Sequence, residues 1–167
     1  MNTLPKVRVV SAADAFLHTA KDLYELRLDG VNWVYPFGVN AGLAIELYLK
    51  SYIAEDDDIP ALEFPDGSVI YQHHVKSKSK KHRLEQLFKC IPPNIQLDIE
   101  KKYKVNELSK KYVTLTLALE RFSNIFVECR YPYEQGGFKG GCMTDLLSLT
   151  SFFKETIYAL QDYVVKL

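Results

Sequence analysis

Three long stretches of the chain place apolar residues at three- and four-residue spacing, which is the period of an amphipathic α-helix. They cover residues 11–28, 106–130 and 146–164. The second stretch predicts one long bundle helix that ends around Arg130, because the next residue precedes a proline and is pushed out of helical geometry. Its repeating apolar positions are Leu108, Tyr112, Leu115, Leu119, Phe122 and Phe126.

The stretch from Asn40 to Tyr52 differs from these helices because it has almost no polar face. A helix that is apolar on every side is typical of the interior of a fold, so we expect it at the centre, after an aromatic link at residues 33–36. Its charged residues are Glu46 and Lys50, one turn apart. Because burial of an unpaired carboxylate is costly, Glu46 either reaches a partner inside the fold or marks the border of a cleft.

A β-hairpin signal follows the central helix. Apolar and polar residues alternate on both sides of the sequence Pro-Asp-Gly-Ser at residues 65–68, which predicts a small hairpin at residues 62–75. The acidic run at residues 55–58 lies before it. Four carboxylates repel one another and are unfavourable at the C-terminal end of a helix, so we interpret this run as a solvated turn rather than a metal site.

Residues 76–83 are the most basic part of the chain and are called the basic segment below; they include Lys76, Lys78, Lys80, Lys81 and Arg83. The basic segment could hold phosphates, and a solvated loop is the alternative interpretation. Shorter helices are expected at residues 81–91 and 93–103, and a Gly-rich loop at residues 136–141. The elements together predict an all-α fold, an antiparallel bundle of four to five main helices with the small β-hairpin inserted.

The composition narrows the class of protein. A chain of 167 residues with 47% hydrophobic residues suits one domain over residues 1–167. The formal net charge of zero argues against a general nucleic-acid coat protein and leaves room for a local basic patch. The three cysteines show no metal-ligand spacing, and no apolar window is long enough to span a membrane. We therefore expect a cytoplasmic protein without a metal, a cofactor or a membrane partner.

The candidate chemistry lies at residues 128–134, where Arg130 is flanked by Tyr131 and Tyr133. A guanidinium offers a planar fork that suits phosphate or carboxylate. It is also favourable at a helix C-terminus without any ligand. A structural pair, for example with Glu46, and a ligand contact are both open. The chain has no P-loop ending, no Glu-x-x-His pair and no Gly-x-Ser-x-Gly sequence.

Three segments together resemble the HEPN family, a group of all-helical domains. They are the central helix at residues 44–50, the sequence His-Arg-Leu-Glu-Gln-Leu at residues 82–87, and the helix end at residues 130–134. The resemblance implies a bundle of four or five helices, frequent homodimers and, in many members, a metal-independent ribonuclease site at the dimer cleft. Such domains are common in bacterial defence and toxin-antitoxin systems.

The family's catalytic signature is an arginine followed, after four to six residues, by a histidine. The matching positions after Arg130 are Gln135, Gly136 and Gly137, and the four histidines all precede Arg130. The resemblance therefore implies a family member without the catalytic histidine, in which Arg130 and Glu46 match the cleft positions. An imidazole is the usual proton donor or acceptor near neutral pH, so its loss removes the expected acid or base.

The first hypothesis is a non-catalytic, dimeric binding module for RNA, a nucleotide or a partner protein. The alternatives are a divergent metal-independent endoribonuclease, in which Tyr131, Tyr133 or His82 replaces the missing histidine, and a purely structural dimerisation protein. The catalytic candidates are Arg130, Tyr131 and Glu46. The candidate ligand-binding residues are Arg130, Glu46, Lys50, Tyr133, Lys80, Lys81 and Arg83.

Overall fold

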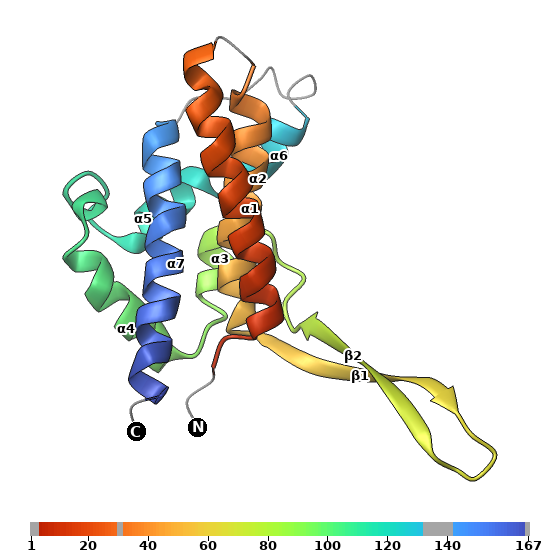
Figure 1. The fold of residues 1–167 in the computed structure, drawn as a ribbon. Coiled ribbons are helices and arrows are strands. Elements are labelled where there is room, and N and C mark those ends of the chain that lie inside the picture. Colours follow the sequence, from red (N-terminus) through yellow and green to blue (C-terminus); the bar gives the residue numbers. More distant parts are fainter. Residues whose placement is uncertain (1–3, 30–31, 132–141, 166–167) are drawn as a thin grey trace.

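The computed structural model describes residues 4–29, 32–131 and 142–165, and the chain is mostly helical with a two-stranded antiparallel sheet (Figure 1). Short 3₁₀ turns cover Leu26–Asp29 and Glu107–Lys110. The helices are α1 (Val7–Glu25), α2 (Val34–Ser51), α3 (Leu84–Phe88), α4 (Pro93–Lys104), α5 (Leu115–Phe122), α6 (Ile125–Arg130) and α7 (Met143–Val165). The strands are β1 (Ala54–Glu63) and β2 (Val69–Ser77).

Helix α2 is the centre of the fold, as its apolar sequence predicts. It packs against α1, α3, α6 and α7. Figure 1 shows α1 running opposite to α2 and α7, so α2 and α7 point in the same direction. The side chains of α2 are buried around most of the helix, including Phe37, Ala41, Ile45, Tyr48 and Leu49. The central position expected for this helix is therefore confirmed.

The start of α2 lies earlier than the sequence predicts. Residues 34–36 of the expected aromatic link belong to the helix and Trp33 is its N-cap, because a proline is tolerated in a first turn whose N–H groups have no helical partner. Trp33 packs edge-on against Tyr24 and Phe37, with ring centroids 5.5 Å from each. Trp33 thus lines the core, as expected.

Two glycines allow α6 to approach α2 closely. An added Cβ at Gly38 would overlap Sγ of Cys129, and one at Gly42 would lie 2.7 Å from Cγ2 of Ile125. Real Cβ atoms do not approach other atoms at such distances, so α6 could not keep its place against a side chain there. The G-x-x-x-G spacing on α2 sets the position of α6, and with it the position of Arg130 at the end of α6.

A polar contact joins three helices on the other side of α2. The hydroxyl of Tyr48 on α2 donates to Asp14 on α1 at 2.6 Å, and the hydroxyl of Tyr158 on α7 donates to the same carboxylate at 2.5 Å. Lys154 lies 3.4 Å from it. Burial alone would raise the pKa of Asp14, but these hydrogen bonds and the lysine charge outweigh burial and lower that pKa below its ordinary value of 3.8.

The hairpin of β1 and β2, called the arm below, is longer than predicted and projects from the helical body (Figure 1). Its turn contains Gly67 with a φ of 83°, as the Pro-Asp-Gly-Ser sequence predicts. Lys6 ties the root of the arm to the body through an ion pair with Asp56 at 2.6 Å. Arg8 adds a hydrogen bond to the carbonyl of His73 at 2.7 Å.

The prediction of a solvated turn at residues 55–58 is wrong, because these residues form part of β1. The reason is that residues outside the run contact three of its four carboxylates. Asp56 pairs with Lys6, Asp58 lies 2.5 Å from Nδ1 of His73, and Glu55 pairs with Lys78. The charges of Lys6, on the N-terminal segment, and Lys78, directly after β2, reduce the repulsion on which the prediction depended.

The prediction of one long helix at residues 106–130 is also wrong. The segment contains a 3₁₀ turn, α5 and α6, with breaks between them. The 3₁₀ turn and α5 each begin at a capping residue: the side chain of Asn106 accepts from the amide of Leu108, and that of Thr114 accepts from the amide of Leu117. The break between α5 and α6 has no side-chain cap. Such local hydrogen bonds compete with a continuous helix although the apolar period continues through them.

The remaining elements differ from the predictions mainly at their ends. Helix α1 begins at Val7, four residues before the predicted start, and α3 is confined to Leu84–Phe88. The Gly-rich loop predicted at residues 136–141 lies outside the described residues. Among the helices that the structure describes, none combines the length and the apolar character that crossing a membrane requires.

Candidate functional site

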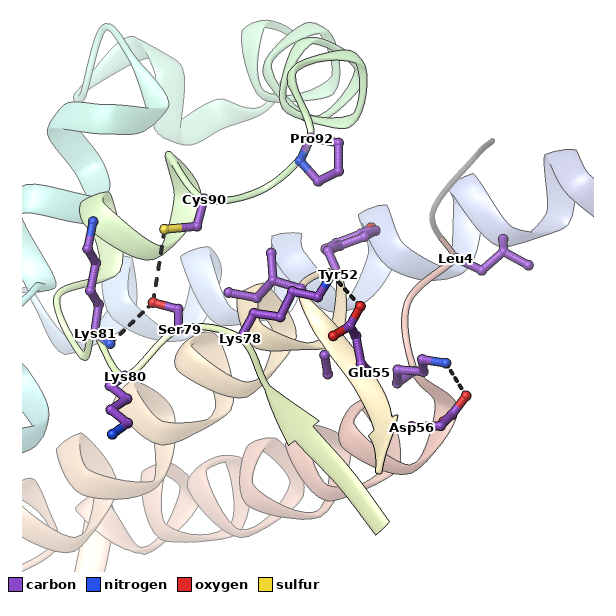
Figure 2. Close-up of a pocket in the computed structure, with 13 residues that line it drawn as sticks. Leu4, Tyr52, Glu55, Asp56, Lys78, Ser79, Lys80, Lys81, Cys90 and Pro92 are labelled. Carbon is purple, nitrogen blue, oxygen red and sulfur yellow. Dashed lines mark hydrogen bonds and ion pairs between the residues drawn. The ribbon is translucent and has the colours of Figure 1, made fainter. Parts of the chain in front are cut away.

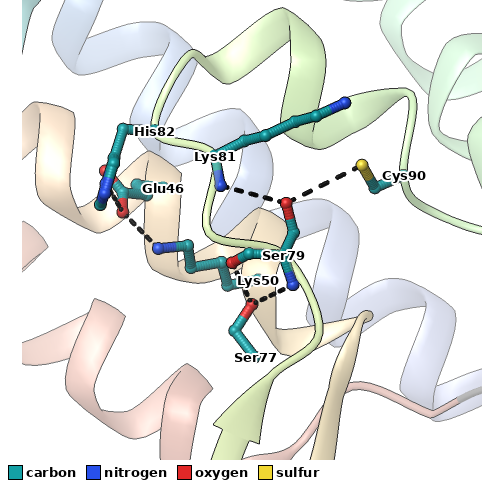
Figure 3. Close-up of polar contacts among 7 residues, drawn as sticks. All are labelled: Glu46, Lys50, Ser77, Ser79, Lys81, His82 and Cys90. Atoms are coloured by element: carbon teal, nitrogen blue, oxygen red, sulfur yellow. Dashed lines mark hydrogen bonds and ion pairs between the residues drawn. The ribbon is translucent and has the colours of Figure 1, made fainter.

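The buried carboxylate of Glu46 is the first part of the candidate site. Only 5% of this residue is exposed. Its Oε1 accepts a hydrogen bond from Nζ of Lys50 at 2.6 Å and lies 3.0 Å from Nδ1 of His82 (Figure 3). Glu46 therefore has the internal partners that the cost of its burial demands. The His82 side chain remains 70% exposed, so one face of this cluster is open to solvent.

A second buried glutamate, Glu85, pairs with Arg83, the residue after His82 in the basic segment. Glu85, at the start of α3, is 5% exposed and pairs with Nε of Arg83 at 2.8 Å. The hydroxyl of Ser123 donates a hydrogen bond to the same carboxylate. It also accepts a hydrogen bond from the amide of Leu84 at 2.8 Å. The C-terminal end of the basic segment is thus fixed at two consecutive residues, His82 on Glu46 and Arg83 on Glu85.

The two lysines before His82 are placed differently. Lys80 and Lys81 are exposed, and among the described residues neither side chain has an ion pair or a hydrogen bond. The backbone that carries them is ordered by serines, because the amide of Lys81 donates to Oγ of Ser79 at 3.2 Å and Oγ of Ser77 donates to the carbonyl of Ser79 at 3.0 Å (Figure 3). Two unneutralised ammonium groups therefore stand on a loop with a defined shape.

These lysines border a broad pocket of about 1420 Å³ between the root of the arm and the start of α4 (Figure 2). Its apolar wall is formed by Leu4, Ile53, Ala54 and Pro92. Its charged rim contains Lys6, Lys78, Lys80 and Lys81 with Glu55 and Asp56. Because Lys6 pairs with Asp56 and Lys78 pairs with Glu55, the excess positive charge comes from Lys80 and Lys81.

Tyr52 also lines this pocket, directly after the end of α2. The residue is 3% exposed, and its hydroxyl has no hydrogen-bond partner among the described residues. Burial raises the pKa of this phenol well above its ordinary value, so the group is a neutral hydroxyl at physiological pH. A buried hydroxyl without a partner is costly and uncommon in folded proteins.

Arg130, the central residue of the predicted site, lies elsewhere. It is exposed at the end of α6, with its guanidinium 5.6 Å from the ring centroid of Phe126 and 5.1 Å from that of Tyr131. Cys129, which precedes Arg130, lies against Gly38. Gly38 is eight residues, or about 12 Å, from Glu46 along α2. The predicted ion pair between Arg130 and Glu46 is therefore wrong.

The other predicted residues divide into two groups. The structure brings Glu46 and Lys50 together with the basic segment, and the ligand-binding roles of Lys80, Lys81 and Arg83 stay predictions. Tyr131 lies next to Arg130, and Tyr133 lies outside the described residues. In the described part of the chain, no three His, Cys, Asp or Glu side chains gather where they could hold a metal ion.

The Glu46–His82 contact gives the site a definite chemical capacity. A carboxylate beside Nδ1 fixes which ring nitrogen carries the proton and orients the imidazole, which leaves Nε2 for solvent or a ligand. The sequence indicated His82 as a replacement beside Arg130, and the roles of Glu85 and Tyr52 were missed. The adjacent His82 and Arg83 before the apolar stripe of α3 were the available signal, because basic groups beside a buried helix need acidic partners.

Comparison with protein-family models, with curated proteins and with solved structures finds no match for this chain.

Proposed function

We propose that this protein is a HEPN-like, non-catalytic module that binds RNA through the basic segment. In this proposal the helices form the family's bundle of four to five members, and two copies associate as a homodimer in the cytoplasm of a bacterium. A role in a defence or toxin-antitoxin system follows from the resemblance. A free nucleotide or a partner protein are the other ligands that the sequence leaves open.

One observation carries the proposal. Neither Lys80 nor Lys81 forms an ion pair with a described residue, while the buried Glu46 and Glu85 hold the adjacent His82 and Arg83 in place. Exposed lysines that are merely solvated do not need an ordered backbone. A phosphate-binding loop does benefit from one, because less conformational entropy is lost when the ligand arrives.

The test is a titration of labelled single-stranded RNA, followed by fluorescence anisotropy, with the wild type and the double variant Lys80→Ala/Lys81→Ala. Binding should weaken as salt rises, and the double variant should flatten the slope of log K against log salt by about 0.7 for each lost phosphate contact. The matched control is Lys21→Ala/Lys104→Ala, which removes the same charge from exposed positions on α1 and α4.

The outcomes separate the ligand classes. Equal RNA affinity of the two double variants would show that binding depends on the net charge of the protein and not on the basic segment. Absence of salt-sensitive binding by the wild type would end the RNA proposal and leave the partner protein. Sedimentation of the wild type at high concentration tests the dimer, and a monomer there would contradict it.

The contact between Glu46 and His82 favours a second candidate, a metal-independent ribonuclease that uses His82 rather than the missing histidine. An oriented imidazole with a free Nε2 can accept a proton from a ribose 2′-hydroxyl, and a lysine beside it can stabilise the developing negative charge. Labelled RNA that is cleaved by the wild type but not by His82→Ala would support this candidate. Cleavage that survives His82→Ala, or intact RNA with the wild type, would end it.

A further inference from the structure

The pocket at the root of the arm has two features that RNA binding does not require, a large volume and a buried phenol. Its volume of about 1420 Å³ exceeds the 300–1,000 Å³ that is usual for small-molecule sites, so a small ligand would occupy a part of it. That part is marked by Tyr52, which Figure 2 places among Pro92, Glu55 and Leu4. A salt-sensitive RNA surface has no need for a buried phenol.

The hydroxyl of Tyr52 is the most unusual group in this wall. Less than a tenth of the residue is exposed, and no described residue accepts or donates a hydrogen bond to the hydroxyl. The apolar wall around it, from Leu4, Ile53 and Pro92, gives a ligand an apolar surface but no polar partner. The hydroxyl oxygen is itself covered, so a side chain of the wall has to move aside before a ligand atom can bond to it and satisfy it.

The charged rim determines the other end of the ligand. Lys80 and Lys81 supply the positive charge that Glu55 and Asp56 do not neutralise. Lysine recognises phosphate as a point charge, and the pocket contains no arginine fork that would favour a planar carboxylate. Ser79 lies between the lysines and Cys90, and its hydroxyl can donate a further hydrogen bond to a phosphate oxygen.

We propose that this pocket binds a small phosphomonoester with an apolar or aromatic body. The phosphate lies beside Lys80, Lys81 and Ser79, and the body packs against Leu4, Ile53 and Pro92. A polar atom of the body bonds to the hydroxyl of Tyr52 when a side chain of the wall moves aside. The ligand can be a free metabolite or the phosphorylated end of a longer molecule. The pocket shares its lysines with the proposed RNA surface but does not depend on RNA binding.

The test measures binding by isothermal titration calorimetry with 4-hydroxyphenyl phosphate, phenyl phosphate and inorganic phosphate as separate probes. The first probe offers a hydroxyl to Tyr52, the second lacks it, and the third lacks the apolar body. The expected order of affinity is 4-hydroxyphenyl phosphate, phenyl phosphate, inorganic phosphate. A 5′-phosphorylated and a 5′-hydroxyl RNA of the same sequence distinguish a phosphorylated end from a free metabolite.

The variant Tyr52→Phe isolates the hydroxyl, and Tyr71→Phe on the arm is the matched control because Tyr71 is 56% exposed. Tyr52→Phe should lower the affinity for 4-hydroxyphenyl phosphate by about 3- to 10-fold, which corresponds to one hydrogen bond. The affinity for phenyl phosphate should stay nearly unchanged. In the empty protein the same variant should raise the denaturation midpoint, because it removes a buried hydroxyl without a partner. Tyr71→Phe should do neither.

Three results would overturn the proposal. They are equal affinity for all three probes, no detectable binding of either aryl phosphate, and an aryl phosphate affinity that survives Lys80→Ala/Lys81→Ala. Each of these is independent of the RNA experiment. RNA binding that fails while aryl phosphate binds would end the proposed function alone, and the reverse result would end this inference alone.

Discussion

Nδ1 of His82 lies 3.0 Å from Oε1 of Glu46, although the two residues are separated by 36 positions in the sequence. The same oxygen accepts a hydrogen bond from Lys50, one turn further along α2. The contact fixes the basic segment to the central helix at the point where the arm ends and α3 begins. Each of the proposals above depends on this attachment, because it determines where the lysines stand.

Replacement of Glu46 by glutamine should therefore destabilise the protein. The change keeps the size of the side chain but leaves the largely buried ammonium of Lys50 without its counter-charge, and we expect a loss of about 1–3 kcal/mol in the free energy of unfolding. Urea denaturation measures the loss. Glu120→Gln on the exposed face of α5 is the control. Equal midpoints for the two variants would show that the Glu46 cluster adds no stability.

Replacement of Asp14 should have an effect that depends on pH. Hydrogen bonds from Tyr158 and Tyr48 hold the pKa of this carboxyl below 3.8 in the folded protein. A lowered pKa stabilises the folded state at pH values above 3.8, and this contribution disappears as the pH falls through the folded value. Asp14→Asn should cost about 1–3 kcal/mol near pH 7, where the charged hydrogen bonds are complete.

The measurement is the free energy of unfolding of the wild type and of Asp14→Asn at neutral pH and at a series of acidic values. The difference between the two proteins cancels the contributions of the other carboxyls. It should shrink as the pH falls below 3.8. A difference that stays constant with pH would mean that the charge of Asp14 does not contribute.

A methyl group at Gly38 should destabilise the protein although alanine is a better helix former than glycine. The added Cβ would overlap Sγ of Cys129, and overpacking of this kind costs about 1–3 kcal/mol. The double variant Gly38→Ala/Cys129→Ala removes the overlapping sulfur and should recover part of the loss. A double-variant cycle by urea denaturation measures the coupling. Stabilisation by Gly38→Ala alone would contradict the close contact between α2 and α6.

The three thiols should differ in reactivity. Cys90 and Cys142 are exposed, whereas Cys129 is buried between α6 and α2. Burial raises the pKa of the Cys129 thiol to about 11, and the charge of Glu128 adds to the effect, so little thiolate is present at neutral pH. Ellman's reagent should titrate two thiols rapidly in the native protein and the third only in denaturant. Rapid reaction of all three would contradict the burial of Cys129.

The sequence predicted well those features that depend on composition along one element. An apolar circumference placed α2 at the centre, and the Pro-Asp-Gly-Ser turn placed the hairpin. It failed where a residue acts through a partner that is distant in sequence. The acidic run at residues 55–58 suggests a turn as long as its contacts with Lys6, His73 and Lys78 are unknown. The apolar period at residues 106–130 likewise concealed caps that divide the helix.

The candidate site shows the same limit. The sequence identified Glu46 as a buried acid and residues 76–83 as a basic segment, but it paired Glu46 with Arg130 instead of His82. A family signature gives the types of residue in a cleft, and it does not say which turn of a helix each one faces. The orphaned hydroxyl of Tyr52 could not be found from the sequence, because the absence of a partner is a property of the packed structure.

The arm is tied to the helical body at its root, through Lys6 and Arg8, and it extends beyond these contacts as a two-stranded ladder (Figure 1). On one face, Leu62 lies opposite Ile70 near the turn, and both residues are about half exposed, at 52% and 53%. A hairpin without a third strand is marginally stable in water. We therefore expect the outer rungs of this ladder to open and close independently of the body, so that amide hydrogens at the tip exchange while the helices stay folded.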